Sequence, residues 1–338
     1  MKKPKFITVE AFQTNFIESG QELTLVCGTQ KDLQRPIAEP TVNRPGFALA
    51  GFIKHFAYRR IQAIGRAESS YLRSLTQEER RKCYERIFSY KIPCFVFCRG
   101  LRPDPEFIEA AVEAKIPVFR CPSISMRFVS LATHTLDELF APRKLEIGCM
   151  MDILGVGVLI KGKSGIGKSE CVLSLLKWGY SLVSDDATEL MLTEGRELIG
   201  SPTKESKDFM EVRGIGVINV ADMFGIKSIR TKKRLDIVVT LAPLEEMTEI
   251  DRLGNNTKTI EIMGVRLPHL ILPVSAGRDT GRLVEVAAFQ TKLRVSGHPS
   301  GTEQYNKRIK EKMERERKMK MEGKLPIWNK LSPGKCLE

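Results

Sequence analysis

The segment GKSGIGKSE at residues 162–170 has three glycines, two lysines and two serines within nine residues. It is too rich in glycine for a helix interior and too small in side-chain volume for a core strand. From Gly162 to Ser169 it fits the pattern GxxxxGK[ST], in which backbone N–H groups surround phosphates. Lys168 would reach the outer phosphates, and the Ser169 hydroxyl would bind Mg²⁺. We expect the nucleotide-binding loop to consist of Gly162, Lys163, Ser164, Gly165, Ile166, Gly167, Lys168 and Ser169.

The sequence around this loop supplies the context that such a loop requires. Residues 152–161 form an apolar run that predicts a strand, and residues 170–179 carry apolar side chains at helical spacing before a glycine stop. A helix that begins at the loop directs the positive end of its dipole at a bound anion. The alternative is a flexible turn without a ligand; the full pattern in this context favours the phosphate site.

Carboxylates that could complete a metal–nucleotide site follow soon after the loop. Asp185 and Asp186 end the apolar stretch SLVSDD, and phosphate-bound metals need carboxylate ligands. Because adjacent strand residues point in opposite directions, one Asp could face a metal while the other faces a hydroxyl nucleophile. The alternative is that the pair caps a following helix. Glu211, in MEVRGIGVINV, is a third candidate, although a lone acid is ordinarily a surface residue.

The elements that must position these residues alternate between strands and helices, which predicts an α/β fold. In the first half we expect a helix at 78–90, a buried strand at 92–100, and a proline-opened helix followed by a strand within 103–121. Residues 135–144 read as a connector, with Pro142 ending a helical turn. In the second half we expect strands within residues 181–186, 234–242, 257–274 and 282–289.

The length of 338 residues suggests two domains. We place an N-terminal α/β domain at residues 1–135 and a catalytic domain at 136–302, and we read 303–338 as a basic helical tail. The tail has few apolar anchors. It is either a solvated helix or an arm that docks an acidic partner or a neighbouring subunit.

The composition gives a formal charge of +13. Such a surplus favours acidic partners such as nucleotides, nucleic acid or an acidic protein; the alternative is a solvated basic surface. The N-terminus lacks the apolar core of a signal peptide, and the longest apolar runs are too short to span a bilayer. We therefore expect a soluble cytoplasmic protein without a membrane partner. The eight cysteines show no zinc spacing, and we expect no disulfides.

Several motifs in order carry a resemblance to a known family. The loop-to-SLVSDD segment is followed by ELIGSP (197–202), MEVRGIGVINV (210–220), DRLG (251–254) and ILPVSAGRD (271–279). The N-terminal half contributes NRPGFALAGF (43–52), RIQAIGRAE (60–68) and LDELFAPR (136–143). Together they resemble the HPr kinase/phosphorylase family, up to about residue 296.

The resemblance implies a bacterial enzyme that transfers phosphate from ATP or pyrophosphate to a serine of HPr, a small carrier of the sugar phosphotransferase system. It implies a reverse reaction in which inorganic phosphate removes that phosphate and pyrophosphate is released. It also implies a role in regulating carbon metabolism, a homohexamer, Mg²⁺ as cofactor, and a C-terminal domain related to phosphoenolpyruvate carboxykinase.

Carried over by position, the family's roles fall on the residues singled out above. Lys168 matches the active-site lysine, and Asp186 matches the carboxylate that takes the serine proton and returns it in the reverse reaction. Ser169 and Glu211 match the magnesium ligands, and Arg252 matches a catalytic arginine. Residues 210–219 match a segment that the family uses in both directions, and residues 273–278 match a segment tied to dephosphorylation.

The sequence departs from the family at two positions near the phosphate-handling residues. The family has a histidine before the glycine at 148, where this chain has Ile147, and P-V-R-P-G-R where this chain reads PVSAGR with Ser275. Isoleucine neither titrates nor hydrogen-bonds, and losing an arginine weakens a phosphate site. We therefore expect kinase activity to survive and phosphorolysis to be weak or absent.

Two other classes compete with this interpretation. A divergent P-loop kinase or GTPase-like switch would act on another protein or a small molecule; the long N-terminal domain and the Asp-Asp spacing argue against a small-molecule enzyme. A nucleic-acid binder is suggested by the charge, but the sequence has no recognition motif and aromatics make up only 7%, so we expect no nucleic-acid partner.

Overall fold

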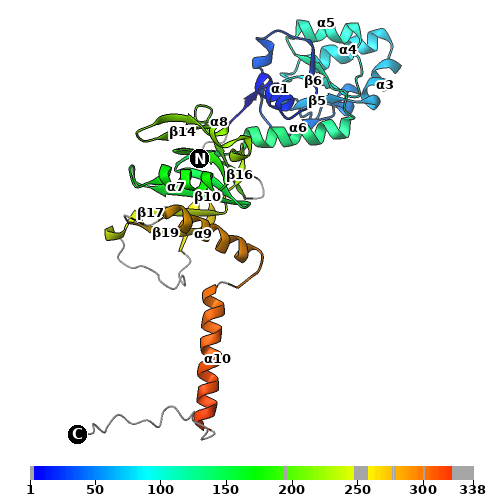
Figure 1. Ribbon diagram of the computed structural model, residues 1–338. Coiled ribbons are helices and arrows are strands. Elements are labelled where there is room, and N and C mark those ends of the chain that lie inside the picture. The colour runs from blue at the N-terminus through cyan, green and yellow to red at the C-terminus, as the bar shows by residue number, and fades with distance from the viewer. Residues whose placement is uncertain are drawn as a thin grey trace, which may run out of the picture. The chain divides into compact units, whose positions relative to one another are not determined.

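The computed structural model describes residues 4–193, 196–246, 258–275, 277, 279–299 and 301–321 (Figure 1). The chain divides into two compact units. Unit 1 comprises residues 1–144 with 191–196, and unit 2 comprises residues 145–190 with 197–338. Each unit is built on its own α/β sheet, so the predicted two-domain α/β architecture is confirmed.

Unit 1 contains a five-stranded sheet in the order β2-β7-β6-β5-β4, in which β4 to β7 run parallel and β2 is antiparallel. A short antiparallel pair, β1 with β3, stands apart from it. The elements of unit 1 are β1 (Ile7–Thr8), α1 (Val9–Glu18), β2 (Thr24–Cys27), the 3₁₀ helix η1 (Asp32–Gln34), β3 (Pro36–Ile37), β4 (Val42–Asn43), α2 (Gly46–Leu49), β5 (Ile61–Ile64), α3 (Arg66–Ser74), α4 (Gln77–Phe88), β6 (Phe95–Phe97), α5 (Pro105–Glu113), β7 (Val118–Arg120) and α6 (Ser125–Phe140).

Local sequence signals explain where these helices begin. Thr76 caps α4 by accepting from the Glu79 amide while the Glu79 side chain reaches back, which is a capping box. Asp104 caps α5, and Pro105 occupies the first turn, where no N–H is needed. The helix expected at 78–90 and the helix and strand expected within 103–121 are thereby confirmed, and the buried strand within 92–100 is the short β6.

Apolar side chains cover both faces of the unit 1 sheet. Phe12 and Phe16 of α1 pack with Phe128 of α6 in one cluster. Tyr84 of α4 and Phe107 of α5 pack with strand residues in the second cluster, where four other rings surround Phe107 at centroid distances of 5.1–5.2 Å. Burial of these rings contributes to the stability of this unit.

Unit 2 has a six-stranded sheet in the order β11-β9-β10-β17-β19-β18 and a second sheet in the order β16-β13-β12-β8. Its elements, with β8 and β12 reaching into the residues of unit 1, are β8 (Arg143–Ile147), β9 (Cys149–Ile153), β10 (Val156–Gly162), α7 (Lys168–Lys177), β11 (Ser181–Ser184), β12 (Ala187–Leu192), β13 (Leu198–Pro202), β14 (Phe209–Val212), β15 (Gly216–Asn219), α8 (Val220–Phe224), η2 (Ile226–Ser228), β16 (Lys233–Arg234), β17 (Ile237–Pro243), η3 (Leu244–Glu246), β18 (Lys258–Ile262), β19 (Val265–Val274), α9 (Thr280–Val295) and α10 (Gly301–Met321).

The direction of the strands decides which loops meet. β10, β17 and β19 are parallel neighbours, and β11 runs the same way because β9 is antiparallel to both β10 and β11. The carboxyl ends of these four strands therefore lie at one edge of the sheet, as does the start of β9. We call this edge the carboxyl edge of unit 2.

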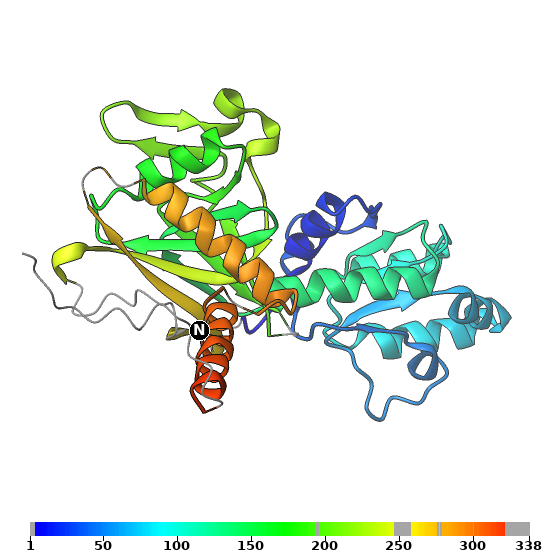
Figure 2. The same ribbon diagram turned by 60° about the horizontal axis from the view of Figure 1, so that its bottom comes forward.

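The six-stranded sheet is covered on both faces. Helices α7 and α9 lie side by side on one face (Figure 2), where Val172, Leu175 and Val284 join the apolar cluster of the sheet. On the other face the second sheet approaches closely: a Cβ added at Gly157 would lie 1.8 Å from the Arg234 carbonyl oxygen. Only glycine permits that approach, so β10 is held between two layers.

Three expectations about elements need correction. The run 152–161 is not one strand: it holds the turn of the β9–β10 hairpin at Leu154 and Gly155, both with positive φ. Residues 282–289 are not a strand but the middle of α9, which Asp279 caps by accepting from the Arg282 amide. Residues 135–140 are not a connector but the last turns of α6, which ends before Pro142.

The predicted tail begins with a helix, α10, whose exposed surface is rich in charge. The part of the tail from 322 to 338 lies outside the described residues. Within the described part of the chain, no helix has the length and apolar character needed to cross a membrane.

Candidate active site at the carboxyl edge of unit 2

The glycine loop joins the buried strand β10 to α7, as the sequence predicts. Gly165 and Gly167 adopt φ values of 80° and 101°, which side chains disfavour. At Gly162 a Cβ would lie 2.8 Å from Cγ2 of Ile166 and 3.0 Å from the Leu241 carbonyl oxygen. The glycines are therefore required by the backbone path of the loop, whatever the loop binds.

The side chains at the start of α7 are placed to act on a ligand of this loop. The Lys168 Nζ lies 3.2 Å from the carbonyl oxygens of both Gly162 and Lys163, so it donates across the loop to its opposite side. Ser169 is half-buried in the first turn of α7. The N-cap, Gly167, offers no capping side chain, so the first N–H groups of the helix stay available to an anion.

Asp185, at the end of β11, is 4% exposed and is tied on both oxygens. Its Oδ1 accepts from the Cys149 thiol at 3.0 Å, and its Oδ2 accepts from the Glu211 amide at 3.0 Å. Burial raises the pKa of this carboxyl above its ordinary value, while the two hydrogen bonds oppose that rise. Asp185 is therefore engaged by the protein and is poorly placed to bind a metal.

Asp186 differs from its neighbour in every respect that matters for chemistry. It is exposed and has φ 55°, an unusual backbone conformation for an aspartate, and its carbonyl oxygen accepts from the Gly148 amide at 2.8 Å. A strand, β12, follows it, so the alternative that the two aspartates cap a helix is wrong. Of the two carboxylates, Asp186 is the one accessible to a substrate.

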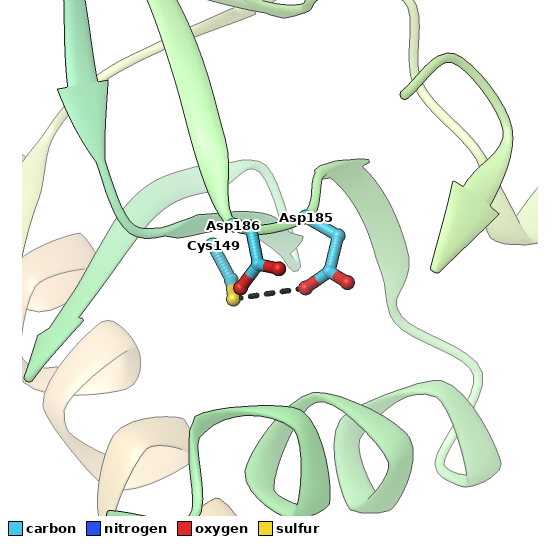
Figure 3. A group of neighbouring side chains, drawn as sticks. All are labelled: Cys149, Asp185 and Asp186. Carbon is cyan, nitrogen blue, oxygen red and sulfur yellow. Dashed lines mark hydrogen bonds between the residues drawn. The ribbon is translucent and has the colours of Figure 1, made fainter. Parts of the chain in front are cut away.

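Cys149 completes a group of three side chains with the two aspartates (Figure 3). One ligand atom from each residue lies within 4.8 Å of the others. The thiol is buried. Burial raises its pKa most, and the negative charge of the neighbouring Asp185 raises it further. It is therefore a neutral hydrogen-bond donor at the site, a contact that sequence reasoning missed because Cys149 shows no motif spacing.

Glu211 lies on β14, in the hairpin formed by β14 and β15. Its side chain is exposed, whereas Met210 and Val212 on either side are buried in the core cluster. This alternation is that of a strand with one buried face. Its backbone reaches the site through the bond to Asp185, and its carboxylate is an oxygen donor of the kind that Mg²⁺ prefers.

Arg213, at the tip of the same hairpin, is a second residue that the sequence analysis did not single out. A Cβ added at Gly165 would lie 3.5 Å from its Nη1 and 3.7 Å from its Nη2. The guanidinium therefore lies beside the glycine loop and could contact phosphate oxygens there. The only sequence signal is its position within the glycine-rich segment MEVRGIG.

The two departures from the family pattern lie at this edge as well. Ile147 ends β8, directly before the Gly148 that donates to Asp186, and is 74% exposed. Ser275 follows the carboxyl end of β19 and is half-buried. Of the remaining expected site residues, Arg252 and two positions of the 273–278 segment, Ala276 and Arg278, lie outside the described residues.

Together the fold and the site define a two-domain α/β protein whose glycine-rich strand–loop–helix edge also carries an exposed carboxylate. Family comparison agrees: the model of the HPr Serine kinase N terminus matches residues 7–136, and that of the HPr Serine kinase C-terminal domain matches residues 138–309. The chain belongs to the HPr kinase/phosphorylase family.

Two relatives support the same assignment by sequence. The HPr kinase/phosphorylase of Chloroherpeton thalassium is 38% identical over 312 residues, which is 92% of this chain and 91% of that protein. The HPr kinase/phosphorylase of Geobacter sulfurreducens is 39% identical over 291 residues, 86% of this chain and 91% of that protein. The solved Hpr(Ser) kinase/phosphatase of Coxiella burnetii is 30% identical, covers 46% of this chain and 93% of its own, and gives a TM-score of 0.44.

Proposed function

We propose that the chain is an ATP-dependent kinase that phosphorylates a serine of HPr, and that its ability to reverse the reaction by phosphorolysis is weak. The observation that carries the proposal is the meeting of the glycine loop, Lys168 and the exposed Asp186 at the carboxyl edge of the mixed six-stranded sheet, in a chain of this family. Phosphoryl transfer needs alignment and charge neutralisation more than covalent help, and this edge supplies both.

Each residue then has a distinct part in the reaction. The loop amides and the N-terminus of α7 hold the nucleotide phosphates, and Lys168 neutralises charge on them. Asp186 accepts the proton of the acceptor serine as its oxygen attacks, and returns it in the reverse direction. Arg252 is proposed to stabilise the transferring group; β17, the described strand that precedes its segment, ends at the carboxyl edge.

The residues fit Mg²⁺ as the cofactor. Ser169 provides a hydroxyl and Glu211 a carboxylate, which are hard oxygen donors suited to this ion. When bound, the ion supplies positive charge that draws electron density from the phosphate oxygens. Asp185, whose oxygens are occupied by Cys149 and the Glu211 amide, is not needed as a ligand.

The weak reverse reaction follows from what the edge lacks relative to the family pattern. At position 147 an exposed isoleucine can neither hold a phosphate oxygen nor exchange a proton with Asp186. At position 275 a serine replaces a fixed cation. The forward reaction has the loop and Lys168 to hold its phosphates, whereas inorganic phosphate must be held by the very positions that are changed.

The test uses purified full-length protein, HPr from the same organism, Mg²⁺ and ATP labelled at the γ-phosphate. We expect label on one HPr serine, located by mass spectrometry, and none with Asp186→Ala. Phosphorylated HPr with inorganic phosphate should release pyrophosphate far more slowly than the kinase reaction runs. Label on another protein or small molecule only would refute HPr as substrate; equal forward and reverse rates would refute the weak phosphorolysis. The expected hexamer and the relation to phosphoenolpyruvate carboxykinase stay predictions.

A further inference from the structure

Asp185 connects three segments that are distant in the sequence. Its buried carboxylate ends β11, accepts from Cys149 at the start of β9, and accepts from the Glu211 amide in β14. A carboxylate with both oxygens used in this way is a structural junction. Leaving the amide or the thiol without its acceptor in a buried position would be costly.

The β14–β15 hairpin is the segment that depends most on this junction. It forms a two-stranded sheet of its own, and its turn and β15 expose Ile215 and Val217. Isolated hairpins are marginally stable in water. Met210 and Val212 bury one face of β14 in the core, which specifies the residues that face inward.

The bond between Asp185 and the Glu211 amide reinforces this register, because it ties β14 to the end of β11. A slip by one residue would turn Glu211 toward the core and Met210 toward solvent, because strand side chains alternate. It would also move Arg213 away from Gly165, beside which it now lies. This hydrogen bond therefore helps to hold the hairpin that carries Glu211 and that places Arg213 beside Gly165.

We propose that Asp185 is a positioning residue that fixes the β14–β15 hairpin, and with it Glu211 and Arg213, relative to the turn that carries Asp186. The proposal rests on the proposed function, because it concerns the alignment of the same site. Cys149 assists by donating its thiol hydrogen to the second carboxylate oxygen, which holds the carboxylate plane toward the amide (Figure 3).

The main test compares Asp185→Ala with Asp185→Asn in the full-length protein. The alanine removes the acceptor; the asparagine keeps an amide oxygen for the Glu211 N–H. We expect hydrogen exchange at the Glu211 amide to be about tenfold faster in Asp185→Ala and near that of the parent in Asp185→Asn. In kinase assays Asp185→Ala should raise the Mg²⁺ concentration for half-maximal rate several-fold and lower kcat, with Asp185→Asn in between.

Two controls keep the test decisive. Should Asp185→Ala fail to fold, Cys149→Ala and Cys149→Ser replace it: serine keeps an O–H donor and alanine does not, so faster Glu211 exchange is expected only in Cys149→Ala. Parent-like exchange in folded Asp185→Ala, or in Cys149→Ala where that pair is used, overturns the proposal. Hydrogen exchange needs no turnover, so it tests the junction independently of the kinase activity. If the Glu211 amide exchanges faster in the variant but the parent protein labels no HPr, the junction stands and the proposed function is refuted.

Discussion

Helices α3 of unit 1 and α7 of unit 2 begin in nearly the same way and end in different roles. Each follows a parallel strand, has glycine as N-cap and carries a glutamate in the first turn. In α3 the glutamate, Glu68, is 5% exposed and accepts from the Gly65 amide at 2.9 Å. In α7 the matching Glu170 is exposed, and no side chain caps the helix.

The difference lies in the backbone of the cap and in the charge beside it. Gly65 has φ −106°, whereas Gly167 has φ 101°. Arg44 pairs with both oxygens of Glu68, at 3.1 Å and 2.9 Å, and so neutralises the acid within the fold. At α3 the buried carboxylate of Glu68 supplies a negative charge beside the positive end of the helix dipole. At α7 the matching glutamate is exposed, so the start of the helix beside Lys168 is open to an external anion. The comparison teaches that similar strand–glycine–helix connections can differ in whether a carboxylate of the chain itself or an external anion lies at the start of the helix.

The largest effect should come from removing Lys168, the cation at the open start of α7. We expect Lys168→Ala to lower kcat/KM for HPr phosphorylation by on the order of 10³-fold, because charge on the phosphates loses its fixed counterion. Arg44→Ala, which removes the cation beside the start of α3, should leave kcat/KM within about twofold, since Arg44 pairs with Glu68 and lies outside the proposed site. Steady-state kinetics at saturating Mg²⁺ measure both variants. Comparable losses of kcat/KM in Lys168→Ala and Arg44→Ala would contradict the difference drawn between α3 and α7.

The next effect is on stability, and it is expected at the start of α3 in unit 1 and not at α7. Glu68→Ala should lower the free energy of unfolding by about 1–2 kcal/mol, because the buried Gly65 amide loses its acceptor and α3 loses its cap. Arg44 is half exposed and can regain water, which keeps the loss modest. The matched change Glu170→Ala should alter stability by under about 0.5 kcal/mol. Urea unfolding of both variants provides the measurement, and equal losses would show that the two helix starts are alike.

A smaller effect separates the strain of the loop from its ligand. Gly167→Ala and Gly155→Ala both place a Cβ at positive φ, so each should cost about 1 kcal/mol of stability. Only Gly167→Ala should weaken ATP binding, by about tenfold, because the amide path around the phosphates shifts. Gly155 lies in a hairpin turn outside the glycine loop. Calorimetric titration of ATP into both variants tests this, and unchanged affinity in Gly167→Ala would count against the loop as a phosphate site.

The smallest effect is a pH dependence of the unfolding free energy, caused by His269 in the six-stranded sheet of unit 2. Burial, reinforced by Lys161 and Lys258, lowers the pKa of His269, which bonds Thr240 at 2.8 Å. The unfolded chain therefore takes up the proton first, so stability should fall as the pH drops through the unfolded pKa of about 6.5 toward the folded one. His269→Gln should flatten this slope. Unfolding free energies at pH 7.5 and 5.5 would reveal it, and identical slopes would exclude His269 as the cause.

How much of this could be predicted from sequence depends on how local each feature is. The loop and α7 follow from a contiguous pattern, and the structure forms them where expected. The different roles of Asp185 and Asp186 could not be predicted, because they depend on Cys149 and on an amide 26 positions away in the chain. The same holds for Arg213, which reaches the loop only once β14 and β15 pair.

The errors in element type also have physical causes. Residues 282–289 are apolar enough for a strand, but their buried positions, Val284, Ala287 and Ala288, repeat with helical spacing after the Asp279 cap. The run 152–161 hides a turn because Leu154 is apolar; Asp152, which accepts from the Gly155 amide, was the available signal. In both cases a polar side chain marks the structure that forms, where the apolar residues alone allowed two.

The most direct test of the central claim, that the carboxyl edge of unit 2 is a phosphotransfer site with Asp186 as the proton acceptor, is a single-turnover measurement. Enzyme in excess over HPr, with Mg²⁺ and labelled ATP, is quenched at successive times for the parent protein and for Asp186→Asn. The account predicts that nucleotide binding is retained and that the transfer rate falls by about 10²–10⁴-fold. Transfer by Asp186→Asn at the parent rate would contradict it.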